Sequence, residues 1–467
     1  MQKRSDPRMS ALDAIFKAYD IRGIYPDEID ESVARRVGNA FVGFTGAGRV
    51  LVGRDARPSG ESLVAAFLEG ATLAGADVID LGLASTDLVY FAAGHFDAPA
   101  AMFTASHNPA AYNGIKLCRA GAAPVGEDTG LRQIKASVQD GLLERGDQTG
   151  RVEGRSLLPE FVQHVRSFVD LSALAPLRVV ADTANGIGGL VVPAVFDGLP
   201  FDFSILFAEL DGTFPNHPAD PIQPENLVDL QHEVTATGAD VGLAFDGDAD
   251  RVFLVDDRAQ PVSGSLTTAI VARAILERQN SSPAAADLDP ADRTVVHNLI
   301  CSKTVPEIVR ELGGTPVRTR VGHSFIKEVM AETGAIFGGE HSGHYYFRDN
   351  YRADSGLIAA LVVLETLSRA EVPLSELRTS LERYAASGEI NRRVPDPAAS
   401  IEAVAAAFAT ADQDHLDGLT VDLGDWWFNL RASNTEPLLR LNLEAADAES
   451  CAEHTAEVLA IVAGKAD

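Results

Sequence analysis

The chain has 467 residues, of which 46% are hydrophobic and 23% charged, and it carries a formal net charge of -28. The length predicts about three domains, and the composition excludes a disordered, fibrous or membrane-embedded protein. The excess of carboxylates excludes general binding to nucleic acids and anionic membranes, because both present phosphate groups to an acidic surface.

The cysteines and the first residues favour a cytoplasmic protein. Cys118, Cys301 and Cys451 are far apart and form no spacing typical of a disulfide framework or a zinc site. Residues 1–10 are polar and charged, without the apolar core of a secretory signal. The longest apolar run, Leu357 to Leu364, is too short to cross a bilayer. We therefore expect a cytoplasmic protein. Because its net charge is negative, a phosphate-bearing ligand would need a local basic pocket.

Strand-like and helix-like segments alternate along the chain, which predicts repeated βαβ units and an α/β fold. The predicted strands are 49–52, 76–81, 177–181, 239–245 and 294–299, and the predicted helices are 60–74 and 302–312. Charged or turn-forming residues near 152–156, 256–260 and 370–374 separate these segments. We therefore predict four regions, 1–154, 155–257, 258–370 and 371–467, with a surface loop at 279–293.

The segment Asp246-Gly247-Asp248-Ala249-Asp250-Arg251 directly follows an apolar strand. In extended backbone, residues at i, i+2 and i+4 project to one side, so Asp246, Asp248 and Asp250 are predicted to converge. Three carboxylates require a cation, and all-oxygen ligation at the carboxyl end of a strand favours Mg²⁺. The Arg251 guanidinium is suited to hold a phosphate beside it.

Three other interpretations of this acidic segment compete with a magnesium site. A calcium loop of the EF-hand kind needs glycine at its sixth position and glutamate at its twelfth, where this chain has Arg251 and Asp257. An aspartyl phosphatase, with the first carboxylate as nucleophile, is a minor alternative. The third is a solvated acidic turn, which the adjacent Arg251 disfavours.

A second segment, Thr104-Ala105-Ser106-His107-Asn108-Pro109, lies in a turn-prone loop and precedes Lys116. A serine among small residues, flanked by His107 and Lys116, can act as a nucleophile or carry a phosphate. Glycines do not bracket it two positions away on each side, as they do in a serine-hydrolase elbow, so acyl transfer is disfavoured. Taken alone, such a serine is as often a turn or cap residue.

Two further segments offer groups that bind sugars and anions. Gly339-Glu340-His341-Ser342-Gly343-His344, preceded by Val321-Gly322-His323-Ser324, combines groups that can bracket sugar hydroxyls. An isolated histidine there is more often structural than catalytic. Arg431-Ala432-Ser433-Asn434-Thr435-Glu436-Pro437 can form an anion cradle, or simply a helix N-cap.

Together these segments resemble the α-D-phosphohexomutase superfamily, and within it the bacterial phosphomannomutase/phosphoglucomutase branch. TASHNP, DGDADR, GEHSGH and RASNTEP occur in the family's order at about its spacing, and Tyr19 to Gly23 and Gly53 to Arg57 also resemble family sequence. The resemblance covers nearly the whole chain. It implies three similar α/β domains and a smaller C-terminal α+β domain around a central cleft, with one of the four motifs in each domain.

The resemblance also implies a reaction and its cofactor. Ser106 would be a phosphoserine whose phosphate, together with Asp246, Asp248 and Asp250, ligates Mg²⁺. It would give its phosphate to a hexose phosphate, forming a hexose 1,6-bisphosphate that reorients and returns its other phosphate to the serine. Such transfer needs alignment and neutralisation of spreading negative charge rather than elaborate covalent chemistry.

Further residues are implied at positions that match the family's motifs. Arg22, Lys116, Arg251 and His344 would assist proton transfer or stabilise the transferring group. Tyr19 and His323 would contact the substrate, and Glu340 and Ser342 would hold the sugar's 3- and 4-hydroxyls. Arg431, Ser433, Asn434 and Thr435 would hold the nonreacting phosphate.

The choice of sugar depends on two positions. Ile300 stands where some dual-specificity relatives have a lysine before the cysteine at Cys301, and the nearest lysine is Lys303. His341, where phosphoglucosamine mutases usually have glutamine, favours mannose or glucose. The alternatives are a phosphoglucosamine mutase and a noncatalytic protein that binds sugar phosphates. The sequence does not fix the oligomeric state.

Overall fold

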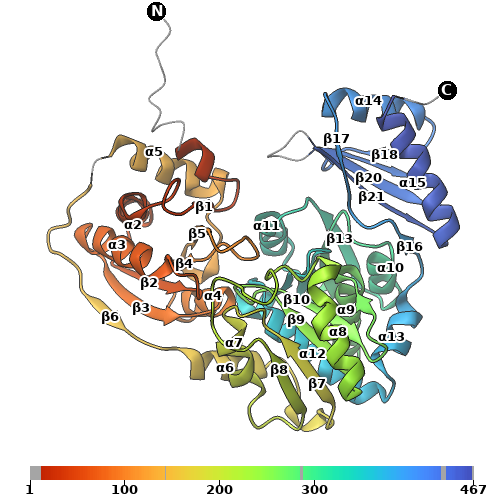
Figure 1. Ribbon diagram of the computed structural model, residues 1–467, viewed down its shortest axis with the longest axis horizontal. Coiled ribbons are helices and arrows are strands. Elements are labelled where there is room, and N and C mark those ends of the chain that lie inside the picture. Colours follow the sequence, from red (N-terminus) through yellow and green to blue (C-terminus); the bar gives the residue numbers. More distant parts are fainter. Residues whose placement is uncertain (1–11, 142, 284–287, 433–437, 465–467) are drawn as a thin grey trace, which may run out of the picture. The chain divides into compact units, whose positions relative to one another are not determined.

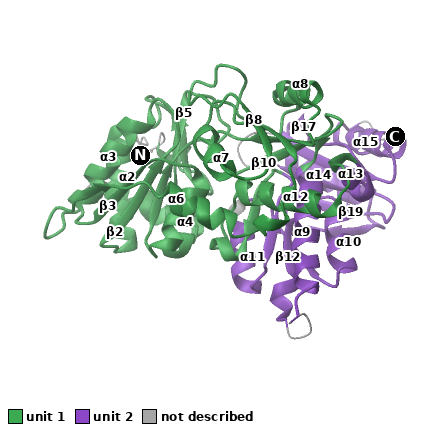
Figure 2. Ribbon diagram, turned by 90° about the horizontal axis from the view of Figure 1, so that it is seen from below, with its two compact units in different colours: residues 1–263, 342–375 green, residues 264–341, 376–467 purple. Residues whose placement is uncertain are grey.

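The computed structural model describes residues 12–141, 143–283, 288–432 and 438–464 of the chain. The chain divides into two compact units (Figure 2). Unit 1 comprises residues 1–263 and 342–375, and unit 2 comprises residues 264–341 and 376–467. Within the described ranges, no helix combines the length and the apolar character needed to cross a membrane.

The N-terminal part of unit 1 is a six-stranded sheet in the order β1-β5-β4-β2-β3-β6 (Figure 1). Strands β4, β2, β3 and β6 are parallel, whereas β5 is antiparallel to β4 and β1 is antiparallel to β5. The elements are β1 (Ile21–Ile24), α2 (Glu31–Thr45), β2 (Arg49–Arg54), α3 (Gly60–Leu73), β3 (Asp77–Leu83), α4 (Thr86–His95), β4 (Ala100–Phe103), β5 (Tyr112–Cys118), α5 (Arg132–Asp140) and β6 (Val152–Gly154). The alternation of strand and helix places the loops after β4 and β2 at one edge of this sheet.

Helices α2 and α3 pack closely over this sheet because glycines lie where their backbones meet. A Cβ atom on Gly70 would lie 1.9 Å from the Arg35 carbonyl oxygen, and one on Gly38 would lie 2.3 Å from the Phe67 carbonyl oxygen. The Asn39 amide donates to the Gly70 carbonyl oxygen at 3.1 Å. The two helices and the strands beneath them share one apolar core.

A second sheet in unit 1 has the order β11-β10-β9-β7-β8. Strands β9, β7 and β8 are parallel, and β10 and β11 form an antiparallel edge. The elements are α6 (Leu158–Arg166), β7 (Arg178–Asp182), α7 (Gly188–Phe196), β8 (Asp202–Leu206), α8 (Val228–Thr237), β9 (Val241–Phe245), β10 (Val252–Asp256) and β11 (Pro261–Val262). The charged turn at 257–260 therefore connects two strands of one hairpin.

Two elements from later in the chain complete unit 1. They are β15 (Tyr345–Phe347) and α12 (Gly356–Ala370). Helix α12 is apolar almost all round, and its residues 356–365 are all buried. This burial accounts for the long apolar run in the sequence, since a helix surrounded by protein has no polar face.

Unit 2 contains a parallel sheet and an antiparallel sheet. In the first, β12 pairs in parallel with β13 and β14; in the second, the order is β16-β21-β20-β19-β18, with β17 also paired to β21. The elements of the first are α9 (Gly264–Asn280), β12 (Thr294–Asn298), α10 (Thr304–Glu311), β13 (Thr315–Thr319), α11 (His323–Thr333) and β14 (Phe337–Gly339). Those of the second are β16 (Ala385–Ala386), β17 (Ile390–Arg393), α14 (Pro397–Ala407), β18 (Asp412–Asp414), β19 (Leu419–Asp422), β20 (Trp427–Ala432), β21 (Leu438–Ala445) and α15 (Ala448–Val462). Helix α13 (Leu374–Leu381) leads from unit 1 into unit 2.

The predicted fold class is confirmed. All the strands and helices predicted from periodicity are present within a few residues of their expected ends, and the C-terminal sheet is antiparallel with α14 and α15 packed against it. The predicted loop at 279–293 begins with the end of α9 and ends in a 3₁₀ turn at Pro290–Arg293, and its residues 284–287 lie outside the described ranges.

The contact between α2 and α3 generates a first prediction. Gly70→Ala should destabilise unit 1 by roughly 3 kcal/mol, because a methyl group cannot fit against the Arg35 carbonyl without moving a helix. Thermal unfolding followed by circular dichroism measures this effect. Gly48→Ala is the matched control, because a Cβ atom there meets nothing within 4 Å. Equal melting temperatures for the two variants would contradict the predicted close contact.

Candidate active site

Ser106 lies in the loop between β4 and β5, in a backbone conformation that few serines adopt. Its φ is 50°, in the left-handed region, and its backbone N–H donates to Thr104 Oγ1 at 2.9 Å. The side chain is buried and points toward the second sheet, where its hydroxyl donates to Asp246 Oδ2 at 2.8 Å. Such a backbone conformation persists only when surrounding groups hold it, and it is typical of functional sites.

Arg57 holds this loop in place. Its guanidinium is fully buried and uses all five of its N–H groups. Nε donates to Asp55 Oδ2 at 3.1 Å, and the terminal nitrogens donate to four loop carbonyl oxygens, those of Ser106, Asn108, Pro109 and Tyr112, at 2.7–2.9 Å. The planar, forked guanidinium is the side chain that can satisfy so many carbonyls from one point.

Asp246, Asp248 and Asp250 lie in the tight turn between β9 and β10. Our prediction that they converge because of extended backbone was wrong in its cause: the segment is a turn in which Ala249 has a φ of 59°. The turn nevertheless brings one carboxylate oxygen from each aspartate within 4.8 Å of the others. Gly247 lets this turn approach the serine loop, because a Cβ atom there would lie 2.5 Å from the Ser106 carbonyl oxygen.

The three carboxylates are almost inaccessible to solvent, each at most 1% exposed. Burial raises the pKa of Asp246 and of Asp250 above the usual range of an aspartate. Burial opposes ionisation of Asp248 too, but the Lys116 ammonium and the Thr86 hydroxyl hold the pKa of that carboxyl below its usual range. A buried cluster of this kind needs neighbouring cations to remain charged.

Two basic side chains supply part of that positive charge. Lys116 on β5 places Nζ 2.7 Å from both Asp248 Oδ2 and Asp250 Oδ2. Arg251 donates from Nε to Asp246 Oδ2 at 2.8 Å and from Nη2 to Ser106 Oγ at 2.9 Å. Burial opposes the protonation of Lys116, but the two aspartates raise its pKa well above the usual value. Both side chains are therefore cations in contact with the aspartates, and Arg251 also contacts the serine hydroxyl.

The carboxylate oxygens of the cluster are suitable ligands for a metal ion. Asp248 Oδ1 and Asp250 Oδ1 are buried and have no hydrogen-bond partner within the part of the chain that the structure describes. Two orphaned carboxylate oxygens beside a third carboxylate form a hard, all-oxygen donor set, which suits Mg²⁺. The residues present thus fit the predicted divalent cation.

Two histidines border the cluster. His107 Nδ1 accepts a hydrogen bond from Arg251 Nη2 at 2.6 Å, and burial together with the positive charge of Arg251 lowers the pKa of His107 to about 2, so its imidazole is neutral. His344 has Nε2 3.8 Å from Asp250 Oδ1 and 3.9 Å from Asp354 Oδ2. Its Nδ1 lies 3.1 Å from the Ser342 hydroxyl. His344 is thus held between a hydroxyl and two carboxylates.

Arg22 and Tyr19, on or just before β1, complete the predicted residues of unit 1. Arg22 forms an ion pair with Asp20 and donates to Asn108 Oδ1 at 2.6 Å, which connects it to the serine loop. Tyr19 is half-buried next to that ion pair in sequence. Unit 1 therefore contains Ser106, the three aspartates and all the predicted catalytic side chains.

Of the other predicted substrate contacts, Ser342 also belongs to unit 1, whereas His323, Glu340 and Arg431 belong to unit 2. Glu340 is buried at the end of β14, where Oε1 accepts from Asn298 Nδ2 and from the Gly322 backbone N–H, both at 3.2 Å. His323 is the first residue of α11. Arg431 near the end of β20 pairs with Glu389 at 3.3 Å. Ser433, Asn434 and Thr435 lie outside the described residues.

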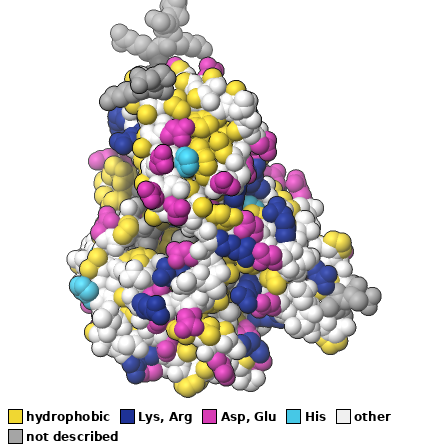
Figure 3. Space-filling model, turned by 90° about the vertical axis from the view of Figure 1, so that its right-hand side faces the viewer, with side chains coloured by type: hydrophobic (Ala, Val, Ile, Leu, Met, Phe, Trp, Pro, Cys, Tyr) yellow, Lys and Arg dark blue, Asp and Glu magenta, His cyan; other side chains and the backbone are white. Residues whose placement is uncertain are grey.

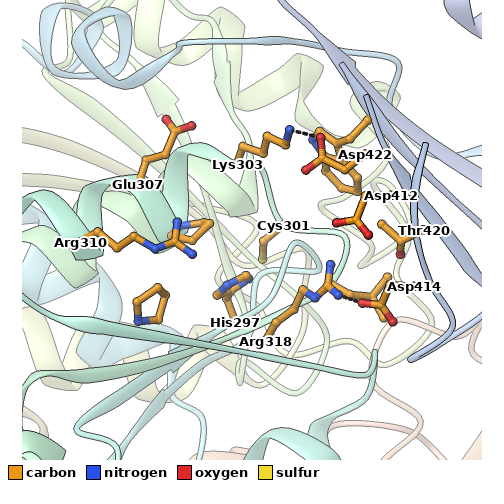
Figure 4. A pocket seen from close by; sticks show the side chains of 14 residues that line it. His297, Cys301, Lys303, Glu307, Arg310, Arg318, Asp412, Asp414, Thr420 and Asp422 are labelled. Atoms are coloured by element: carbon orange, nitrogen blue, oxygen red, sulfur yellow. Dashed lines mark hydrogen bonds and ion pairs between the residues drawn. The ribbon is translucent and has the colours of Figure 1, made fainter. Parts of the chain in front are cut away.

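Unit 2 also contains a polar pocket of about 450 Å³ (Figure 4). Arg310 of α10, Lys303 just before it and Arg318 of β13 face acidic side chains from β18 and β19 across it. Two ion pairs, Lys303–Asp422 and Arg318–Asp414, bridge the two sides. None of the predicted site residues lines it. The ammonium of Lys303, the lysine nearest to Ile300, is held by Asp422 at 2.7 Å.

The surface gives no sign of one extended acidic field on the face shown in Figure 3. Acidic and basic side chains are interspersed on that face. The net charge of -28 therefore coexists with the local positive charge that Lys116 and Arg251 supply at the buried cluster.

Two residues with clear roles in the site were not predicted. The segment Gly53 to Arg57 was noted only as family-like, although Arg57 is the main support of the serine loop. Thr86 donates to Asp248 Oδ2 at 2.6 Å, although 162 positions separate the two residues. The positive charge of Arg57 within this family-like segment could have drawn attention to it, whereas no local pattern marks Thr86.

Comparisons with known proteins agree with this arrangement. Family models described as phosphoglucomutase/phosphomannomutase, alpha/beta/alpha domains I, II and III, match residues 13–144, 159–260 and 263–384, and the model of the C-terminal domain matches residues 389–461. Phosphohexose mutases of Xanthomonas campestris pv. campestris are 40% identical over 454 residues, 96% of this chain and 99% of theirs. The phosphomannomutase of Salmonella typhimurium is 39% identical over 441 residues, 92% of this chain and 94% of its own.

Solved structures are similar over the same length. A phosphoglucomutase/phosphomannomutase family protein from Burkholderia thailandensis superposes with a TM-score of 0.86 at 32% identity, covering 97% of this chain and 98% of that one. An N-acetylphosphoglucosamine mutase variant from Aspergillus fumigatus, in complex with glucose 1,6-bisphosphate, shares the fold with a TM-score of 0.61 at 14% identity, covering 98% and 99%.

The buried contacts of Arg57 generate a second prediction. Arg57→Lys should lower the free energy of unfolding by roughly 3 kcal/mol or more, because a single ammonium cannot satisfy four buried carbonyls and Asp55. Denaturant unfolding measures the loss, with Arg49→Lys at the exposed start of β2 as the control. If Arg57→Lys were as stable as Arg49→Lys, the serine loop would not depend on the guanidinium.

His297, which lines the pocket of unit 2, generates a third prediction. Burial, with Arg318 and Arg310 nearby, lowers its pKa from the usual 6.5 to about 4. The unfolded chain therefore binds a proton that the folded chain does not between these values, and stability falls as the pH falls through this window. From pH 7 to pH 5 wild type should lose roughly 2 kcal/mol more than His297→Gln. Parallel loss of stability in urea titrations of both proteins would contradict this.

Proposed function

Since the chain belongs to the phosphoglucomutase/phosphomannomutase family, we propose that this phosphohexomutase interconverts the 6- and 1-phosphates of mannose and glucose through a phosphorylated Ser106. The observation that carries the proposal is the position of the Ser106 hydroxyl, which lies 2.8 Å from Asp246 Oδ2 and 2.9 Å from Arg251 Nη2. A phosphate on that oxygen would lie next to both the aspartate cluster and the Arg251 guanidinium.

The first half of the reaction moves the phosphate from the enzyme to the sugar. A free hydroxyl of the hexose phosphate attacks phosphorus, the bond between phosphorus and Ser106 Oγ breaks, and a new bond to the sugar oxygen forms. The proton of the attacking hydroxyl ends on Ser106 Oγ, with His344 as the group suited to relay it. Arg251, Lys116 and Arg22 counter the negative charge that spreads over the transferring phosphoryl group.

The second half uses the same groups on the other phosphate. The hexose 1,6-bisphosphate turns so that its second phosphate faces Ser106, whose hydroxyl takes the phosphoryl group while the freed sugar oxygen takes the proton. Net transfer is internal, and the serine ends as it began. The bisphosphate must be retained while it turns. Because it can return a phosphoryl group to Ser106, we propose that hexose 1,6-bisphosphate also activates enzyme that has lost its phosphate.

We propose Mg²⁺ as the cofactor, held by Asp246, Asp248, Asp250 and the Ser106 phosphate. The support is the donor set itself, with its two orphaned carboxylate oxygens. When bound, the ion neutralises charge on the transferring phosphoryl group.

Sugar recognition is proposed from the positions that match family motifs. Tyr19 and His323 would contact the substrate, and Glu340 and Ser342 would hold its 3- and 4-hydroxyls. Arg431 with Ser433, Asn434 and Thr435 would hold the nonreacting phosphate. Mannose and glucose differ at carbon 2, so a site that grips the 3- and 4-hydroxyls accepts both sugars.

The remaining proposals concern setting and organisation. The three cysteines are buried and form no disulfide, which favours the reducing cytoplasm. We keep the four domains 1–154, 155–257, 258–370 and 371–467 as a proposal, with the phosphoserine, metal, sugar and phosphate motifs in that order. Small sugar phosphates, rather than nucleic acid or membrane, are the proposed ligands.

A coupled assay with mannose 1-phosphate and glucose 1-phosphate, Mg²⁺ and a trace of the 1,6-bisphosphate tests the function. We expect turnover of both sugars, stopped by EDTA, and a loss of more than about a thousandfold for Ser106→Ala with substrate binding retained. The control is Ser137→Ala, on the exposed face of α5. Preference for glucosamine 6-phosphate would make the enzyme an amino-sugar mutase, whereas binding without turnover would make it noncatalytic.

A further inference from the structure

Helix α4 begins in contact with the turn that carries Asp246, Asp248 and Asp250 rather than at the surface. Its first residue, Thr86, is fully buried and donates from Oγ1 to Asp248 Oδ2 at 2.6 Å. The Thr86 backbone N–H also donates to the Asp248 carbonyl oxygen at 3.1 Å. One residue of the first sheet's helices thus holds both the backbone and the side chain of a predicted metal ligand.

We propose that Thr86 is a positioning residue for the metal ligand Asp248. The two oxygens of this carboxylate are treated differently: Oδ2 accepts from Thr86 Oγ1 and from Lys116 Nζ at 2.7 Å, whereas Oδ1 has no partner among the described residues. Two donors fix the carboxylate plane and leave one oxygen bare. The inference rests on the proposed function, because it takes Asp248 to be a metal ligand.

The place of Thr86 in its helix makes its hydroxyl available for this task. Inside a helix a threonine hydroxyl commonly donates to the carbonyl four residues earlier, as Thr72 does to Leu68 in α3. Thr86 is the first residue of α4, so the residue four positions earlier, Gly82, lies in β3. The hydroxyl proton is therefore directed at Asp248, and the branched Cβ restricts the side chain to few rotamers.

The start of α4 is itself firmly held. Ser85 is its N-cap, accepting from the Leu88 N–H at 3.4 Å and donating to Asp87 Oδ1. Asp87 Oδ2 accepts from Ser355 Oγ at 2.7 Å, and Ser355 is the N-cap of α12. Ser85, Asp87 and Ser355 are fully buried. Thr86 is consequently placed by two helix ends rather than by a loose loop.

A donor that orients a metal ligand affects metal affinity more than it affects folding. Removal of such an outer partner commonly weakens metal binding by roughly 10–100-fold. Substrate contacts elsewhere in the site are unchanged by the loss of one hydroxyl at Asp248. The expected signature is thus a weaker metal site with unaltered affinity for the sugar phosphate.

The experiment measures Mn²⁺ binding to the full chain by electron paramagnetic resonance, with the Mg²⁺ concentration for half-maximal turnover as a second readout. Thr86→Val, which keeps the shape but lacks the hydroxyl, should weaken Mn²⁺ binding by roughly 10-fold or more. Thr86→Ser should bind nearly as wild type, because it keeps the donor. Thr72→Val is the matched control for loss of a buried threonine hydroxyl, and the KM for the sugar phosphate should stay constant throughout.

The outcomes separate this inference from the function on which it rests. Asp248→Asn should abolish the Mn²⁺ binding seen in wild type. If wild type binds no Mn²⁺, or if Asp248→Asn binds it equally well, the metal assignment fails and the inference with it. If that site exists but a folded Thr86→Val binds Mn²⁺ as wild type does, or Thr86→Ser is as weak as Thr86→Val, only the role of Thr86 is overturned. Should Thr86→Val not fold, Thr86→Ala takes its place in the same comparison.

Discussion

The balance of charge around Asp246, Asp248 and Asp250 is the constraint on which the site depends. When all three buried carboxylates are ionised, they face two fixed cations, Lys116 and Arg251, and the cluster has one excess negative charge. A phosphate on Ser106 would add nearly two negative charges, and a divalent ion would remove two. The metal and the phosphate would therefore compensate each other's charge. Either one alone would leave an unbalanced charge in a medium of low dielectric, which is costly in free energy. This mutual dependence is the physical reason that the proposed phosphoserine and the proposed metal ligands would form one site.

Such a cluster functions only if its parts cannot drift apart. The serine and the aspartates come from different sheets, and each sheet contributes something that fixes the contact between them. Arg57 fixes the serine loop through four carbonyls, and Gly247 lets the turn that carries the three aspartates approach the Ser106 backbone. A turn lacks the repeating backbone hydrogen bonds that keep a helix or a sheet rigid. Long-range hydrogen bonds, among them that of Thr86, hold the turn of the three aspartates in place instead. Phosphoryl transfer gains from this preorganisation, because its catalysis consists mainly of alignment and charge stabilisation.

Periodicity was sufficient to predict the α/β fold, because strands such as β2 and helices such as α3 bury faces with the expected spacing. The chemistry of the site was predictable where residues are adjacent in sequence, as in the acidic turn, although the cause of convergence there was a left-handed Ala249 and not strand alternation. Contacts such as Thr86–Asp248 were not predictable, since they depend on how two sheets meet. A hydroxyl at the start of a helix has the same local signature whether it meets water or a buried carboxylate.

The three cysteines have a practical consequence. Each is buried, and burial raises the pKa of Cys301 to about 12. Only a thiolate reacts readily with alkylating reagents or disulfides, so the folded protein offers these reagents almost no native target. One cysteine introduced at an exposed position in each unit would be labelled selectively without first removing the native ones. Spectroscopic probes attached there would report the distance between the units at each stage of the catalytic cycle, in an otherwise unmodified enzyme.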